Sequence, residues 1–94
     1  MEEKRIILKS EDGTSNEYTL LLLFKSNKKN KEYILYTDET YDYDDNLNIF
    51  ARIFNRKNNS VKYIEDEEEY IEVEKVLDKY IDGVDLWKIN LKMN

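Results

Sequence analysis

The chain has 94 residues with no cysteine and no histidine, and its 21 acidic and 15 basic residues give a net charge of −6. This length supports one domain, and the missing residue types exclude disulfides, thiolate metal sites and the usual general base of enzymes. The negative charge opposes direct binding to nucleic acid or to an anionic membrane. We therefore expect a protein without enzymatic activity or a cofactor. The favoured partners are basic protein surfaces or cations.

The N-terminal residues predict neither secretion nor membrane insertion. The opening MEEKRIILKS lacks the apolar centre of a signal peptide. No apolar run approaches the roughly 20 residues that a membrane-spanning helix requires. A cytoplasmic location is expected.

Strands joined by short polar turns are predicted over the first two thirds of the chain. Residues 5–9 form a β-branched apolar run, and Asp12-Gly13 follows as a hairpin turn sequence because both residues tolerate a tight backbone. Residues 17–25 are apolar on both faces at their centre, which predicts a strand covered on both sides. Further strands are expected at residues 31–37, 47–56 and 61–64. Since each connection is short, successive antiparallel pairing in a meander is the simplest topology.

A single helix is predicted over residues 66–82. Its apolar side chains at spacings of three and four are Tyr70, Val73, Leu77 and Tyr80. This periodicity indicates one stripe that packs on the sheet. Asp66 is expected to accept a hydrogen bond from the backbone N–H of Glu69, whose side chain would reach back to the N–H of Asp66 in a capping box. Gly83 is typical of a helix end.

Residues 1–83 are therefore predicted to form a single α+β domain, in which the helix at 66–82 packs on an antiparallel meander sheet of five to six strands. Residues 84–94 form a C-terminal extension whose apolar pattern favours an added strand. Trp87 in this extension either packs on the sheet or anchors a partner, since aromatic side chains dominate interface energies. An added edge strand could also pair with a second copy, so a homodimer is a further hypothesis.

Five segments stand in a distinctive order: IILKSEDG at 6–13, an apolar strand ending in Phe at 18–24, KEYILY at 31–36, NIFARIF at 48–54 and IEDEEEYIEVEKVLDKYID at 64–82. In this order they resemble the YrzB-like family of small acidic bacterial proteins, the domain of unknown function 1292. The resemblance implies the fold class and a bacterial cytosolic location, but no activity, cofactor or catalytic residue. The chain departs from the family pattern after Gly83, where an apolar and basic tail replaces acidic residues.

The loop at residues 38–46, DETYDYDDN, is dense in carboxylates. Asp42, Asp44 and Asn46 match the start of a calcium-binding loop. The match then fails, because Leu47 stands in place of the required glycine and Ile53 in place of the bidentate glutamate. A solvated loop is favoured over a metal site. The residues expected to bind a partner are Asp38, Glu39, Asp42, Asp44, Asp45 and Trp87.

The leading hypothesis is a non-enzymatic protein-interaction or regulatory module that binds through residues 38–46 or 84–94. The alternative is an acidic inhibitor, of a type found in phages or mobile elements, that imitates a line of phosphates with the clusters at 38–45 and 65–69. A basic nucleic-acid surface is less favoured, since lysines in turns and on exposed strands promote solubility. That surface would comprise Lys28, Lys29, Lys31, Tyr33, Arg52, Arg56, Lys57 and Lys62.

Overall fold

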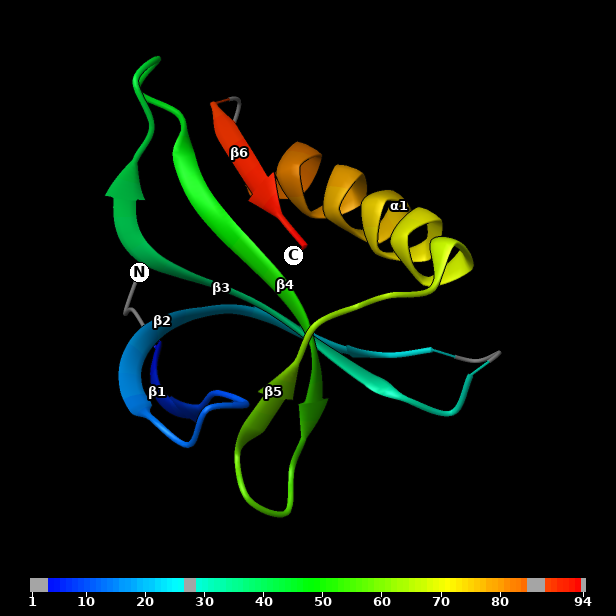
Figure 1. Ribbon diagram of the computed structural model, residues 1–94. Coiled ribbons are helices and arrows are strands. Elements are labelled where there is room, and N and C mark those ends of the chain that lie inside the picture. Colours follow the sequence, from blue (N-terminus) through cyan, green and yellow to red (C-terminus); the bar gives the residue numbers. More distant parts are fainter. Residues whose placement is uncertain (1–3, 27–28, 85–87, 94) are drawn as a thin grey trace.

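The computed structural model describes residues 4–26, 29–84 and 88–93. Its elements in chain order are β1 (Lys4–Lys9), β2 (Ser15–Lys25), β3 (Glu32–Tyr41), β4 (Leu47–Asn55), β5 (Ser60–Lys62), α1 (Glu67–Val84) and β6 (Ile89–Lys92). Figure 1 shows α1 lying along one side of a strongly curved sheet. The predicted α+β class is confirmed. No helix within these ranges has the length and apolar character needed to cross a bilayer.

The sheet follows the predicted meander from β1 to β5, with each strand antiparallel to the next. It is mixed rather than purely antiparallel, because β5 also pairs in parallel with β1, and β6 pairs in parallel with β4. In a meander the first and fifth strands point the same way, so a sheet that curls until they meet joins them in parallel. The second parallel pair needs a crossover. Helix α1 supplies it by carrying the chain back to the end where β4 begins (Figure 1).

The curl begins in β2, where the register against β3 shifts between Leu20 and Leu22. An extra residue of this kind bends a strand and increases its twist. At the far end of the curl, the backbone N–H of Lys9 donates to the carbonyl of Asn59 at 2.9 Å, next to the pairing of Lys9 with Ser60. Strands β1 to β5 therefore enclose a volume on the side of the sheet opposite α1.

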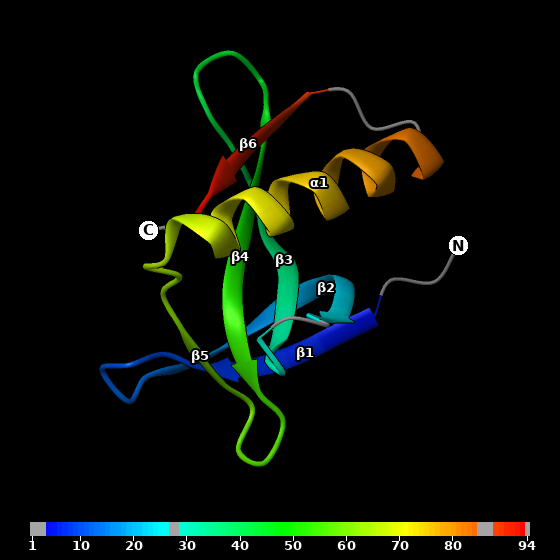
Figure 2. The same cartoon turned by 90° about the vertical axis from the view of Figure 1, so that its right-hand side faces the viewer.

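Each face of the sheet carries its own core. Side chains alternate along β3, so Tyr33 and Leu35 face α1 whereas Ile34 and Tyr36 face the enclosed side. The core beneath the helix contains Tyr33, Leu35, Ile49, Ala51, Ile64, Val73 and Leu77. The enclosed core contains Leu8, Ile34, Tyr36, Phe54 and Val61. Figure 2 shows α1 crossing β3 and β4 above the curled part of the sheet.

The ends of the helix differ from the prediction. Helix α1 continues through Gly83 to Val84. Glycine allows the left-handed backbone conformation that ends many helices but does not require it. Asp66 caps the helix through the N–H of Glu68 at 2.9 Å. The predicted capping box is wrong, since the Glu69 side chain turns toward the sheet and bonds to Tyr33 instead.

The C-terminal strand is shorter than predicted. The sequence predicts an added strand within residues 84–94, but the helix includes Val84 and β6 covers only Ile89–Lys92. Trp87 lies outside the described residues. Strand β6 occupies one edge of the sheet, beside β4.

Candidate functional site

The acidic loop forms the tip of the β3–β4 hairpin, which projects beyond the body of the sheet (Figure 1). The backbone at the tip is closed by two hydrogen bonds, from Asp42 N–H to the carbonyl of Asn46 at 3.0 Å and from Asp45 N–H to the carbonyl of Asp42 at 3.2 Å. Asp45 takes a positive φ of 62°, a conformation that aspartate tolerates better than most residues. The tip is thus a closed turn with a defined backbone.

The side chain of Asp42 stabilises this turn. Its Oδ1 accepts from the N–H groups of Asp44 and Asn46, both at 2.9 Å, and its Oδ2 accepts from the Asn46 amide at 3.1 Å. The hydrogen bond from the backbone of Asn46 is the main reason that the pKa of Asp42 is lowered. The carboxylate therefore faces its own loop. The described ranges also contain no group of three or more acidic side chains placed to hold a metal ion.

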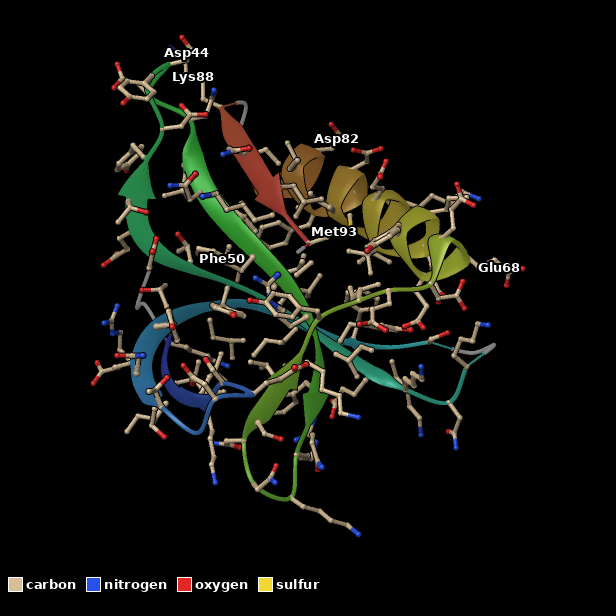
Figure 3. The ribbon with its side chains drawn as sticks, viewed as in Figure 1. Asp44, Phe50, Glu68, Asp82, Lys88 and Met93 are labelled. Carbon is tan, nitrogen blue, oxygen red and sulfur yellow. The ribbon has the colours of Figure 1, made fainter. Side chains whose placement is uncertain are left out.

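The other expected acidic residues do not form one surface. Asp38 Oδ1 accepts from the N–H and the hydroxyl of Thr40, and Glu39 forms an exposed ion pair with Arg5 at 3.4 Å. Asp44 and Asp45 are exposed, and the described part of the chain gives their carboxylates no ion pair. Figure 3 shows Asp44 at the outermost point of the hairpin.

Two tyrosines share this tip. Tyr41 is 62% exposed and Tyr43 is fully exposed, whereas most other aromatic side chains of the described chain are at least partly buried. Neither tyrosine was among the residues expected to bind a partner. Their alternation with acids in TYDYDD is nevertheless a signal, because it places tyrosines where no core pattern continues. The structure therefore presents a tip of two tyrosines and two acids, defined here as residues 41, 43, 44 and 45.

A second feature is a cavity of about 370 Å³ on the enclosed side of the sheet. Its walls include the rings of Tyr18, Tyr36, Phe50 and Tyr63. The Tyr18 and Tyr36 ring centres lie 4.7 Å apart, and those of Tyr36 and Phe50 lie 5.4 Å apart. The exposed residues at its mouth include Glu11, Asp12, Asp38 and Lys62. Asp38 therefore belongs to this cavity rather than to the hairpin tip.

Arg52 reaches this cavity from β4 and is only 8% exposed. Its Nη1 donates to the carbonyls of Ala51 and Lys92, each at 2.9 Å. The guanidinium carbon lies 4.6 Å from the ring centre of Tyr63 and 5.5 Å from that of Phe50, within the range of cation–π attraction. Arg52 belongs to the basic surface that was the less favoured hypothesis, although its alternation with Phe50 and Phe54 was a signal of the enclosed face.

The other basic residues of that hypothesis do not form one surface, and Lys62 lies at both the cavity mouth and a groove. Lys31, Arg56, Lys57 and Lys62 line one groove, where Arg56 is paired with Glu32. Lys29 binds the helix cap Asp66 at 3.1 Å. Tyr33 is buried beneath the helix, and Lys28 lies outside the described residues.

The second acidic cluster, residues 65–69, is engaged by the fold itself. Asp66 caps α1, and Glu69 is 3% exposed while it accepts from the Tyr33 hydroxyl at 2.6 Å and from the Lys31 ammonium at 3.1 Å. Burial first, and then this bond to Glu69, raises the pKa of Tyr33 well above its usual range. These contacts hold the first turn of the helix against β3. Asp66 and Glu69 therefore make contacts that stabilise the fold.

The fold and these surfaces define a small acidic α+β domain with an exposed aromatic hairpin tip and an arginine-containing cavity. The chain belongs to the family described as protein of unknown function (DUF1292), whose model matches residues 11–82. The resemblance found in the sequence is thereby confirmed.

A relative in Leuconostoc mesenteroides subsp. mesenteroides, named UPF0473 protein, is 34% identical over 87 residues, covering 86% of this chain and 88% of the relative. No solved structure matches the chain. Neither the family nor this relative has an assigned activity in its description.

Proposed function

We propose that this protein is a non-enzymatic interaction module of the cytosol, and that it docks on a basic protein surface through the tip of the β3–β4 hairpin. The observation that supports this proposal is the exposure of Tyr41 and Tyr43 beside Asp44 and Asp45 on a turn that Asp42 closes. Isolated apolar side chains on a surface are ordinary, but two neighbouring tyrosines on a projecting turn are typical of interface anchors.

The preformed turn favours binding because little backbone entropy is lost when a partner meets it. Tyrosine adds a large apolar ring and a hydroxyl at a low cost in side-chain entropy. The adjacent carboxylates favour lysine and arginine on the partner and speed the encounter at low salt. The module thus acts through shape and charge, without chemistry of its own.

The test compares capture by the wild-type chain with capture by two variants. Tyr41→Ser/Tyr43→Ser removes the proposed anchors, and Ile71→Ser removes a similarly exposed apolar side chain from the helix as a matched control. We expect a specific protein to be retained by the wild type and by Ile71→Ser, and to be lost with the double variant. Asp44→Asn/Asp45→Asn should slow its association mainly at low salt. Equal capture by the double variant would refute the proposal.

The nucleic-acid mimic has weaker support from the structure. It needs the two acidic clusters to act as one line of charge, but Asp66 and Glu69 are engaged by the fold. Figure 3 also shows Asp44 and Glu68 far apart on the molecule. A captured protein that binds DNA or RNA, and releases it when this chain is added, would favour the mimic instead.

A further inference from the structure

The cavity on the enclosed side of the sheet contains a buried cation without a matching anion. No carboxylate of the described residues lies within ion-pair distance of Arg52. Two backbone carbonyls and the rings of Tyr63 and Phe50 compensate this charge only in part. A ligand that brings a carboxylate to this position would complete the pairing.

Arg52 lines the cavity, and the described residues leave two of its donor nitrogens, Nε and Nη2, without a hydrogen bond. Nη1 uses both of its N–H groups on the carbonyls of Ala51 and Lys92. Nε and Nη2 make no hydrogen bond within the described ranges, yet no buried side-chain nitrogen or oxygen there is left without a partner. Nε and Nη2 are therefore not fully buried. Because Arg52 lines the cavity, Nε and Nη2 supply the pair of donors from which a carboxylate can accept two parallel bonds.

Tyr36 adds a donor on the same wall. Burial raises the pKa of this tyrosine to about 12, so its hydroxyl keeps its proton at neutral pH. The described residues offer that hydroxyl no hydrogen-bond partner, so its oxygen is not fully buried. Because Tyr36 lines the cavity, the hydroxyl can donate to a ligand there. The rings of Tyr18, Phe50 and Tyr63 complete an aromatic enclosure.

The acidic residues at the mouth of the cavity favour a ligand that also carries a positive charge. The carboxylates of Glu11, Asp12 and Asp38 outnumber the single ammonium of Lys62 there. A simple anion would be repelled as it enters, whereas a cationic group at the mouth would be attracted. Both charge requirements are met by one molecule that carries a carboxylate and an ammonium group on the same carbon, next to an aromatic ring.

We propose that this cavity binds a small aromatic zwitterion of the α-amino acid type, whose carboxylate pairs with Arg52 and whose ammonium group faces Asp38 at the mouth. The volume of about 370 Å³ lies at the lower end of the range for small-molecule sites. The site is separate from the hairpin tip, so this inference does not depend on the proposed docking function.

Three probes dissect the proposal by nuclear magnetic resonance of the ¹⁵N-labelled chain. L-Phenylalanine has both charges, N-acetyl-L-phenylalanine lacks the ammonium group and mimics a chain terminus, and 2-phenylethylamine lacks the carboxylate. We expect L-phenylalanine to shift amide signals in β4 and β5. The acetylated probe should bind with about tenfold weaker affinity, and 2-phenylethylamine should cause no shifts. No shifts at roughly 10 mM L-phenylalanine, which would fill about nine tenths of a site with a Kd of 1 mM, would overturn the proposal.

Two variants test the two charged groups of the ligand separately. Asp38→Asn should weaken L-phenylalanine two- to fivefold, roughly the contribution of an exposed ion pair, and should leave N-acetyl-L-phenylalanine unchanged or tighter. Arg52→Gln should weaken both carboxylate probes at least about tenfold. If Arg52→Gln does not fold, Asp38→Asn and the three probes still show whether the cavity binds the zwitterion. Equal binding of L-phenylalanine and its acetylated form would refute the zwitterion.

Discussion

Removing the hydroxyl of Tyr33 tests how the helix is held on the sheet. Tyr33 is fully buried, and its hydroxyl donates at 2.6 Å to Glu69, which is itself almost fully buried. Tyr33→Phe keeps the ring, its stacking on Phe24 and the packing beneath α1. The variant removes only the hydrogen bond and leaves one oxygen of a buried carboxylate without its donor.

The expected loss follows from the charge of the acceptor. A hydrogen bond to a charged group contributes about 1.5–3 kcal/mol, more than a neutral pair. For a domain of this size, 1 kcal/mol lowers the Tm by roughly 4–8 °C. A loss of about 2 kcal/mol therefore lowers the Tm by roughly 8–16 °C, which thermal and urea unfolding followed by circular dichroism can measure.

A matched control separates the buried bond from the ion pair at the same carboxylate. Lys31 is 43% exposed and donates to the other oxygen of Glu69 at 3.1 Å, so Lys31→Met should cost about 1 kcal/mol or less. In a double-mutant cycle, Tyr33→Phe and Glu69→Gln should show a coupling of about 1 kcal/mol or more. If Tyr33→Phe lies within about 0.5 kcal/mol of the wild type, the reasoning is wrong.

Three further predictions concern the core and the response to pH. Leu77→Ala should destabilise by about 2–5 kcal/mol in urea unfolding, because Leu77 is buried between the helix and the sheet. The backbone hydrogen bond from Glu68, and then Lys29, lower the pKa of Asp66. Its contribution is present above the ordinary aspartate pKa and is lost as pH falls through the lower folded value, so Asp66→Asn should flatten the acid limb of a plot of Tm against pH. An unchanged acid limb would contradict this assignment. Burial raises the pKa of Tyr36 from 10.0 to about 12, so its contribution is complete below pH 10 and is lost as pH rises toward 12. Tyr36→Phe should therefore reduce the slope of Tm against pH in that alkaline range, and an equal slope in both proteins would argue against it.

The elements of this chain follow from local patterns. The apolar stripe of Tyr70, Val73, Leu77 and Tyr80 predicts α1, and polar turn residues separate the five strands of the meander. Both signals depend on residues a few positions apart, so a single sequence reports them directly. Prediction was poorer at the helix ends. The pattern from Asp66 to Glu69 suits a capping box, but a buried tyrosine 36 positions away takes the Glu69 carboxylate.

The candidate sites were predicted only in part. The acidic loop was expected, but its carboxylates are divided among a turn, an ion pair, the cavity mouth and the tip. The prominent feature of the tip is its tyrosines rather than its charge alone. The cavity could not be anticipated, because it joins the loop after β1 to side chains from β2, β3, β4 and β5.

The amino-acid order alone determined the family, the α+β class and the succession of strands and helix, because these depend on local periodicity and turn chemistry. Only the folded chain decided how far the sheet curls, and therefore which face of β4 becomes an interior. That curl converts Arg52 from an apparently exposed strand residue into a buried cation. The physical reason is that burial is a property of distant segments brought together, and the separation of Arg52 from the Lys92 carbonyl along the chain is 40 residues.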